Sequence, residues 1–356
     1  MSFDPNPFKY DKRTNIYNAQ PAALRKFRAS LAKAEAGTGL CDIVMCGTSI
    51  SAGSGSTRTT SWPEYVKALL VNRGYPIGGT GIMAAAGNPA DPRVTLGSGW
   101  SAFTVSGSTL ALCTTAAATI TFVADSAGTF VDVYVWNGGS PGNIAWTIDG
   151  VAQTAIVVGA NNAIFKTTVA GLSNVVHTVV LTCSGTGTTY VLGVDVHGTS
   201  GVKVTNLGLG GATSSNISTT GQAFSPLQVA KVVLPGGLCF IEYGANETSF
   251  SGWQANLVTG ITNLMPVSDV VLIPYAARSG DVSTDPTISP GSSALAGSVG
   301  MRALSDIYGI PVVDIFDRFG PYSSWGTAQA LAFDSVHPNA AGARDMARAV
   351  ASLFSA

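Results

Sequence analysis

Charged side chains are scarce in this chain. Asp, Glu, Lys and Arg make up 11% of its 356 residues, whereas about a quarter is usual in globular proteins. The net charge is −1, and beyond the segment 20–36 there is no cluster of basic residues. We therefore expect no nucleic-acid partner, because binding to nucleic acid needs a basic surface.

Long apolar runs are also missing. No run reaches the roughly 18 residues that would span a bilayer, so we expect no membrane span. The first residues, MSFDPNPFKYDKRTN, are polar and lack the apolar stretch of a secretory signal. The localisation stays unknown from sequence, with an extracellular or virion-associated place as the working hypothesis.

Cysteine is infrequent, and its spacing is uninformative for metals. The odd count and the lack of a CxxC pair argue against a metal site and against a full disulfide framework. The cysteines within apolar runs are expected to be inert core residues. Cys113 and Cys183 share one β-rich segment, and whether they form a disulfide is left open. The five are Cys41, Cys46, Cys113, Cys183 and Cys239.

Glycine, threonine, serine, alanine and valine dominate what remains, and their pattern changes along the chain. Residues 20–36 have helical periodicity, 41–46 form an apolar strand, and 62–72 are helical. The pair Ser61 and Glu64 predicts a capping box at the start of that helix. From about 94 to 197, strand-length runs alternate with Gly, Asn, Asp and Ser turns, which is typical of an antiparallel sandwich or jelly roll.

Helix and strand alternate again in the rest of the chain, which predicts a parallel sheet covered on both faces. We expect an α/β domain interrupted by a β domain, divided into residues 1–95, 96–200 and 201–356. The expected strands are 202–207, 238–243, 270–275 and 312–315, and the expected helices are 253–265, 292–308 and 339–354.

Ser49 is the strongest candidate for chemistry. It follows the apolar strand 41–46 in the small-residue turn Gly47–Gly53, and a strand, a tight turn and a helix are the setting that presents a nucleophilic serine. A serine needs a base at neutral pH, and a histidine oriented by a carboxylate is the usual one. Asp334 and His337, three residues apart, supply that pair near the other end of the chain.

Two further segments follow predicted strands. They contain Gly211, in Asn206–Thr213, and Asn246, in Gly244–Glu247. Loops at the carboxyl ends of parallel strands meet at one edge of the sheet. There the Gly211 N–H, the Asn246 amide and the Ser49 N–H would bind an oxyanion. The Gly-rich segment lacks the Lys-Ser/Thr ending of a phosphate loop.

Taken in order, these four segments resemble the sequence blocks of the SGNH (GDSL-type) hydrolases over roughly residues 40–95 and 200–356. The resemblance implies a flavodoxin-like three-layer α/β/α domain. It does not cover the β-rich segment, which we expect from its residue pattern to be an inserted antiparallel β-sandwich. It implies Ser49, His337 and Asp334 as the catalytic triad and Ser49, Gly211 and Asn246 as the oxyanion hole. Neither a metal nor another cofactor is implied.

The sequence departs from the family in two places. Thr48 stands where the family usually has Asp, and Glu247 stands where it usually has Asp after the asparagine. Neither is the nucleophile, the base or an oxyanion donor. We expect both to support loop geometry, with rate and specificity open to change.

Several other residues could have either a structural or a functional role. His177 and His197 are expected to be structural residues of the β segment, and Cys46 an inert core thiol. Glu242 and Glu247 flank Asn246, but no second carboxylate is placed for a glycosidase pair. Asp281 and Asp285 are interpreted either as lining a cleft or as solvated, and Tyr275, Trp253, Tyr322 and Trp325 as packing residues or a sugar platform.

The resemblance implies a serine esterase, and the β segment favours a glycan substrate by analogy of fold. Removal of O-acetyl groups from a polysaccharide is the leading hypothesis, as in bacterial deacetylases and phage tail esterases. The alternatives are a lipid or small-acyl esterase or thioesterase, with the β domain as lid or oligomer contact, and a non-catalytic carbohydrate-binding adhesin. Tyr134, Trp136, Asn137 and Trp146 are candidate sugar-stacking residues, with core packing as the other interpretation. A homo-oligomer is left open.

Overall fold

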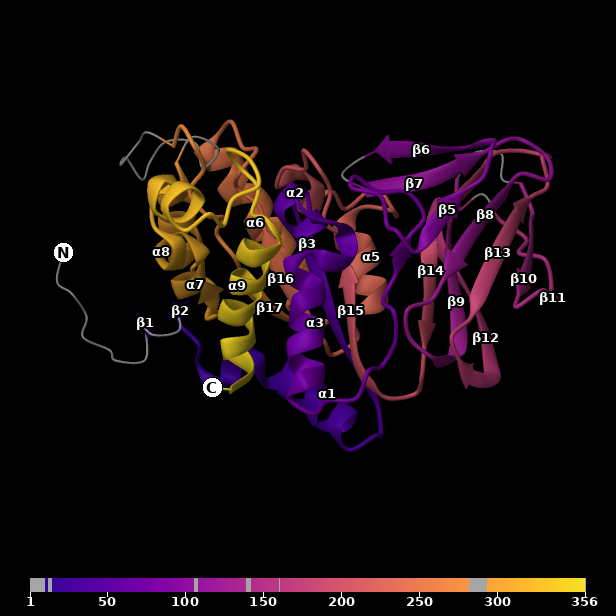
Figure 1. Ribbon diagram of the computed structural model, residues 1–356, viewed down its shortest axis with the longest axis horizontal. Coiled ribbons are helices and arrows are strands. Elements are labelled where there is room, and N and C mark those ends of the chain that lie inside the picture. The colour runs from indigo at the N-terminus through magenta and orange to yellow at the C-terminus, as the bar shows by residue number, and fades with distance from the viewer. Residues whose placement is uncertain are drawn as a thin grey trace.

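The computed structural model describes residues 10–11, 15–105, 108–138, 142–159, 161–281 and 293–355. Most of the N-terminal lead-in and Asp285 lie outside this part of the chain. Figure 1 shows an α/β region around one sheet and, beside it, a region of antiparallel strands. Within the described ranges, no helix is long and apolar enough to cross a membrane.

A seven-stranded sheet forms the centre of the α/β region, in the order β1-β2-β18-β17-β16-β3-β15. The five strands β15, β3, β16, β17 and β18 run parallel. Numbered along the chain they have the order 2-1-3-4-5, which is the flavodoxin-like arrangement. The strands are β1 (Tyr10–Asp11), β2 (Ile16–Tyr17), β3 (Leu40–Gly47), β15 (Gly201–Asn206), β16 (Leu238–Glu242), β17 (Asp269–Leu272) and β18 (Val312–Val313).

Helices cover both faces of this sheet (Figure 1). Alternate side chains of β3 point to opposite faces: Ile43 and Met45 pack with α1, α3 and α9, whereas Val44 and Cys46 pack with α5, α6 and α7. The sheet is therefore buried on both sides. The helices are α1 (Arg25–Glu35), α3 (Trp62–Asn72), α5 (Pro226–Val233), α6 (Phe250–Leu264), α7 (Ala294–Tyr308) and α9 (Ala340–Ala351).

Short helical turns connect these elements. The predicted strand 312–315 ends at Val313, because Asp314 caps the short helix α8 (Ile315–Phe319). The eight-residue helix α5 was not predicted. The other turns are α2 (Ser49–Ala52), α4 (Ser215–Ser218), η1 (Pro21–Leu24), η2 (Arg58–Thr60), η5 (Ser352–Ser355) and a π-helical turn, η4 (Ser323–Ala328).

The predicted capping box at the start of α3 is wrong. Ser61 is the N-cap residue, but its side chain makes no capping hydrogen bond. The Ser61 hydroxyl instead donates to the carbonyl of Arg58 at 2.7 Å and accepts from Asn206 at 3.3 Å. The Ser61 hydroxyl, which the local sequence pattern predicted to cap the helix, is used by these two contacts instead.

Two antiparallel sheets follow α3, in the orders β11-β10-β13-β8-β5 and β12-β9-β14-β7-β6, and β4 also pairs with β14. Side chains from both sheets share one apolar core. Strand β5 spans residue 95, where we predicted a domain boundary. The strands are β4 (Met83–Ala84), β5 (Val94–Leu96), β6 (Trp100–Val105), β7 (Ser108–Cys113), β8 (Thr119–Val123), β9 (Gly128–Asn137), β10 (Ile144–Ile148), β11 (Val151–Ala152), β12 (Ala163–Val175), β13 (Thr178–Cys183) and β14 (Thr189–His197).

The outer face of the six-stranded sheet packs against the α/β region. Tyr134 and Leu192 belong to the same apolar cluster as Leu227 of α5, and the rings of Trp136 and Phe224 are 4.7 Å apart. The predicted sugar-stacking surface is therefore wrong for three of its four residues, which are 3–4% exposed: Tyr134, Asn137 and Trp146. Trp136 is half-buried in the contact between the two regions.

A buried ion network also joins the two regions. Lys203 of β15 contacts Asp195 of β14 at 2.6 Å and Asp42 of β3 at 3.2 Å. Burial would lower the pKa of Lys203, but the two carboxylates outweigh it and raise the pKa. Lys203 therefore stays charged, and its loss would leave two buried carboxylates without a cation.

Replacing this lysine tests how much the junction depends on it. Lys203→Met should lower the free energy of unfolding by roughly 3–5 kcal/mol, because Asp42 and Asp195 lose their counter-charge. Urea unfolding measures the change. Lys166→Met is the matched control: Lys166 also pairs with a buried carboxylate, Asp132, but its side chain is 45% exposed, so its loss should stay within about 1 kcal/mol. Equal losses in the two variants would contradict the assigned role of Lys203.

Candidate active site

Three candidate loops leave the sheet side by side. Strand β3 lies between β15 and β16, with Met45 opposite Asn206 and Gly47 opposite Glu242. Because all three strands are parallel, the loops carrying Ser49, Gly211 and Asn246 emerge at the same edge of the sheet. The order of the strands is therefore enough to bring these three loops close together, although they are far apart in the sequence.

Ser49 is the first residue of α2, a single helical turn at the end of β3. Thr48 before it is extended, and its hydroxyl accepts from the Ile50 N–H. Gly47 has no room for a side chain, because a Cβ would lie 2.5 Å from the Ser51 hydroxyl and 2.8 Å from Glu242 Oε2. This crowded turn holds Ser49 with 8% of its surface exposed.

His337 reaches Ser49 from the loop before α9. Its Nε2 lies 2.9 Å from Ser49 Oγ, and its Nδ1 lies 2.8 Å from Asp334 Oδ2. The structure thus brings the three predicted residues into one hydrogen-bonded chain. With Nδ1 donating to the carboxylate, Nε2 is the acceptor that faces the serine hydroxyl.

Two elements fix the His337 loop. Asn339 caps α9 by accepting from the N–H groups of Ala341 and Gly342, and its amide donates to the Ala330 carbonyl. Gly55 packs against the loop, because a Cβ there would lie 3.0 Å from the Cβ of His337. The loop is therefore held at both the helix and the nucleophile side.

Asp334 is arranged to stay ionised. Burial raises the pKa of its carboxyl, but the hydrogen bonds from the His337 side chain and from the N–H groups of His337 and Val336 outweigh it, so the pKa is lowered. The Tyr322 hydroxyl also donates to the Asp334 carbonyl at 2.9 Å. An ionised Asp334 orients the imidazole and offsets a positive charge on it.

The candidate oxyanion donors lie in the loops that follow the three strands. Gly211 has a left-handed φ of 76°, a conformation that favours glycine. Within the described ranges, no acceptor is paired with the N–H groups of Gly211 or Ser49. Asn246 Nδ2 donates to the Ala212 carbonyl at 2.9 Å, and an amide nitrogen has a second hydrogen to donate.

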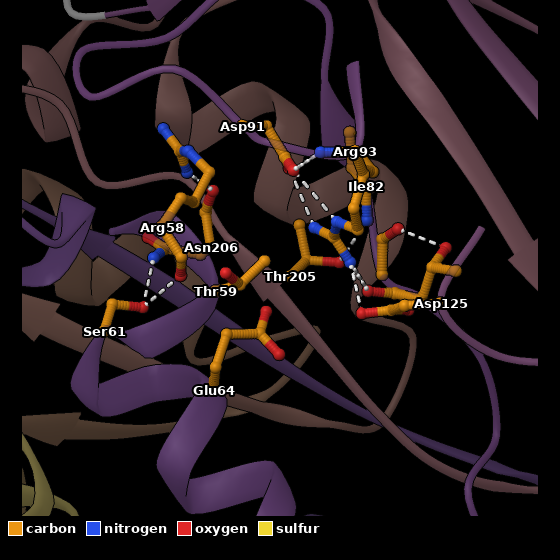
Figure 2. A network of polar contacts seen from close by, with 12 residues as sticks. Arg58, Thr59, Ser61, Glu64, Ile82, Asp91, Arg93, Asp125, Thr205 and Asn206 are labelled. Carbon is orange, nitrogen blue, oxygen red and sulfur yellow. Dashed lines mark hydrogen bonds and ion pairs between the residues drawn. The ribbon is translucent and has the colours of Figure 1, made fainter. Parts of the chain in front are cut away.

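Arg58 and Asn206 brace the Gly-rich loop, and no sequence motif indicated this role of Arg58. Arg58 is buried and donates to the carbonyls of Asn206 and Gly208 at 2.7 and 3.0 Å. Figure 2 shows Arg58 beside Asn206 and Ser61, while Asp91 pairs with Arg93. Burial lowers the pKa of Arg58, and the nearby Asp91 opposes this effect.

Asn206 connects three elements at this point. Its amide donates to the Ser51 carbonyl of α2 at 2.7 Å, and its Oδ1 accepts from the Gly208 N–H at 2.9 Å. The Gly-rich loop is thereby tied directly to the helical turn that carries Ser49. Glu247 makes a second tie by accepting from the Ser214 N–H, so it links the Asn246 loop to the Gly211 loop.

The remaining candidates make structural contacts. Trp253, Tyr275 and Trp325 are fully buried packing residues. Asp281 pairs with Arg278, and Glu242 is fully buried beneath the serine turn, which argues against a glycosidase carboxylate pair. His177 is held by Asp149, in agreement with a structural role.

The cysteines are all buried free thiols, Cys113 and Cys183 included. The sulfurs of Cys46 and Cys239 are 3.9 Å apart in the core beneath the sheet surface. Cys46 therefore lies in the core, as predicted from its apolar strand.

One cluster in the described part of the chain has the residue types of a metal site: Asp132, Asp195 and His197, with atoms within 4.8 Å of one another. Its atoms already have protein partners. Asp132 accepts from His197 at 3.2 Å and Lys166 at 3.1 Å, and Asp195 holds Lys203. Because basic side chains of the protein already neutralise these carboxylates, we interpret the cluster as part of the ion network between the two regions.

Beside the Asp334 loop lies a cavity of about 470 Å³. Its wall includes Arg278, Asp281, Phe316 and Tyr322. The Ser279 N–H donates to the Ser335 carbonyl at 2.8 Å, so this wall is attached to the loop that carries the catalytic candidates. A mixed polar and aromatic lining suits a polar ligand.

No protein family profile matches the sequence, and no curated protein matches it. A solved structure described as a peptidoglycan O-acetylesterase in action is similar over nearly the whole chain. Its TM-score is 0.72 with 16% sequence identity, and the match covers 96% of this chain and 100% of that chain. At this level of sequence identity, the similarity establishes a shared fold and nothing more.

Two further solved structures match less of the chain. A member of the lipolytic G-D-S-L family from Veillonella parvula has a TM-score of 0.34 and 18% identity, covering 43% of this chain and 81% of that chain. A two-domain esterase (CEX) active on acetylated mannans has a TM-score of 0.26 and 18% identity, covering 30% and 34%. The chain thus has the fold of a solved structure described as a peptidoglycan O-acetylesterase, and its parallel strands have the flavodoxin-like order that the predicted resemblance to SGNH hydrolases implies.

Proposed function

We propose that this protein is a serine ester hydrolase that removes O-acetyl groups from a polysaccharide or glycan. The observation that carries the proposal is the hydrogen-bonded chain from Ser49 through His337 to Asp334. A hydroxyl, an imidazole and a carboxylate in this order can generate a nucleophile at neutral pH.

In the proposed mechanism, His337 Nε2 takes the proton of Ser49 as Oγ attacks the ester carbonyl. The tetrahedral intermediate collapses, and the sugar hydroxyl leaves with the proton from His337. Water then attacks the acyl group on Ser49 while His337 takes its proton. The second tetrahedral intermediate collapses, the bond to Ser49 Oγ breaks with the proton returned from His337, and acetate is released. Asp334 keeps the imidazole in the required tautomer through both steps.

The N–H groups of Ser49 and Gly211 and the second amide hydrogen of Asn246 are the proposed oxyanion donors. Their support is the shared edge of the sheet and the absence of other acceptors for both N–H groups within the described ranges. Donors that are fixed before the reaction stabilise the developing charge without reorganising. Arg58 and Asn206 provide that rigidity.

Two observations favour an acetylated glycan as the substrate. The solved structure with the same fold is described as a peptidoglycan O-acetylesterase, and the cavity beside the Asp334 loop has charged and aromatic walls. We assign residues 96–200, together with the part of strand β5 that precedes them, to an inserted, jelly-roll-like β-sandwich. The rest of residues 1–95 and residues 201–356 are assigned to the hydrolase domain. The inserted part would position the polymer beside the catalytic edge.

A series of nitrophenyl esters from acetate to long acyl chains, together with acetylated polysaccharides, tests the substrate class. Fast hydrolysis of acetate with loss of activity on longer chains would support the proposal. A rate that rises with chain length would contradict it in favour of a lipid esterase. Glycan binding without turnover of any ester would contradict it in favour of an adhesin.

Removing the nucleophile is the first prediction for the mechanism. Ser49→Ala should abolish turnover of nitrophenyl acetate without lowering the melting temperature, because the hydroxyl is lost and the turn is kept. Ser352→Ala, in the 3-10 turn η5 at the other end of the chain, is the control with unchanged activity. Substantial turnover by Ser49→Ala would mean that another group is the nucleophile.

The oxyanion assignment predicts a partial loss. Asn246→Ala should lower kcat/KM by the equivalent of about 2.7–4 kcal/mol, as the removal of an oxyanion donor does. Asn263→Ala removes a comparable amide bond, to the Thr259 carbonyl on helix α6, and should leave kcat/KM unchanged. A value of kcat/KM that hardly moves in Asn246→Ala would show that this amide does not contact the oxyanion.

Asp334→Asn should lower kcat by roughly 10⁴-fold through a change of tautomer. Asp334 Oδ1 accepts from the N–H groups of Val336 and His337, so an asparagine would keep its oxygen there and turn its NH₂ toward His337 Nδ1. The imidazole proton would then lie on Nε2, which could no longer accept from Ser49. Steady-state kinetics on nitrophenyl acetate measures the loss, and a kcat close to that of the wild type would contradict the role of Asp334.

A further inference from the structure

A second carboxylate lies directly beneath the serine turn. Glu242 is the last residue of β16 and is fully buried. Its Oε2 accepts from the Thr48 N–H at 3.0 Å and from the Ser51 hydroxyl at 2.8 Å. The Thr48 hydroxyl donates to the same carboxylate, 3.0 Å from Oε1 and 2.9 Å from Oε2.

These bonds hold the turn on both sides of Ser49. Thr48 precedes the serine and Ser51 follows it by two residues, and both donate to one carboxylate on the neighbouring strand. Thr48 Oγ1 in turn accepts from the Ile50 N–H. Glu242 of the neighbouring strand therefore anchors the chain just before and just after Ser49.

The carboxylate has little freedom of its own. A Cβ at Gly47 would meet Glu242 Oε2 at 2.8 Å, so the backbone of β3 closes one side. Burial raises the pKa of Glu242 to about 7, and the hydrogen bonds from Thr48 and Ser51 oppose that rise. The titratable groups that interact with it are the hydroxyls of Tyr243 and Tyr275, whose pKa values burial raises.

A buried carboxylate is costly to keep in a protein. A carboxylate that met only side-chain donors could be replaced together with them by apolar side chains, with little loss of stability. Here the donors include a backbone N–H, which cannot be removed by substitution. The acid is thus matched to the backbone conformation of this turn.

We propose that Glu242 is a positioning residue that fixes the Ser49 hydroxyl for attack by holding Thr48 and Ser51. The inference rests on the proposed serine esterase mechanism. It accounts for Thr48 at a position where related hydrolases usually have an acid, because the carboxylate reaches the turn from β16 instead. Glu242 touches neither the substrate nor His337 in this account, and it acts through the turn.

Four proteins test this role on nitrophenyl acetate, with kcat, KM and melting temperature measured for each: the wild type, Glu242→Ala, Glu242→Gln and Asp269→Ala. Glu242→Ala should lower kcat by about 10- to 100-fold with KM within about threefold, because the buried Thr48 N–H loses its acceptor and the serine loses its fixed geometry. Glu242→Gln should recover kcat to within about fivefold of the wild type, since an amide can accept from the Thr48 N–H and donate to Thr48 Oγ1.

Asp269→Ala is the matched control. Asp269 opens strand β17 of the same sheet and accepts the Phe27 N–H at 2.8 Å, but it lies at the opposite end of the strands. It should lose melting temperature while keeping the kcat of the wild type. Equal kcat losses in Asp269→Ala and Glu242→Ala would overturn the inference, because the effect would then follow stability alone.

Two further results would overturn it: a wild-type kcat in Glu242→Ala, or a Glu242→Gln protein as impaired as Glu242→Ala. If Glu242→Ala does not fold, Thr48→Val removes only the hydroxyl and should lower kcat by about 3- to 10-fold; an unchanged kcat there would overturn the inference as well. Ser49→Ala in the same assay separates the two proposals, because turnover that survives in Ser49→Ala refutes the mechanism itself.

Discussion

The neighbourhood of three parallel strands is the constraint on which the rest of the structure depends. Strand β3 lies between β15 and β16, so the loops that follow them share one edge of the sheet. Ser49, Gly211 and Asn246 are brought together by this order rather than by local sequence. His337 joins them from the other end of the chain because α9 packs beside α1 and α3 on one face of that sheet.

Rigidity at this edge comes from paired polar groups that are buried or half-buried. Arg58 and Asn206 hold the Gly-rich loop, Glu242 holds the serine turn, and Glu247 links the second and third loops. Each of these groups would destabilise the fold if it lost its partners. The same pairing leaves the serine, the histidine and the oxyanion donors little freedom, which is what a preorganised catalytic site requires. The antiparallel sheets are attached through apolar contacts and the Lys203 network rather than by a flexible tether.

The sequence was sufficient for features that depend on pattern and order. Apolar strands ending in small or polar residues predicted the loops of Ser49 and Asn246, and alternating strand and helix signals predicted the parallel sheet. Features that depend on tertiary contacts were not predictable. Arg58 stands in a run of threonines without periodicity, and its partners are about 150 residues away. Ser61 was predicted to cap α3, but a neighbouring element uses its hydroxyl. Tyr134 and Trp146 stand on strands whose pattern fits an exposed platform as well as a core. Only the tertiary packing shows that Tyr134 is buried against the α/β region and Trp146 between the two antiparallel sheets.

In the proposed mechanism, Ser49 carries the acyl group during turnover. The most direct measurement is an acid quench during hydrolysis of an aryl acetate, followed by mass spectrometry of the digested protein. The account predicts an acetyl group on the peptide that contains Ser49, which disappears once the substrate is exhausted. Turnover with an unmodified Ser49, or with the acetyl group on another residue, would contradict it.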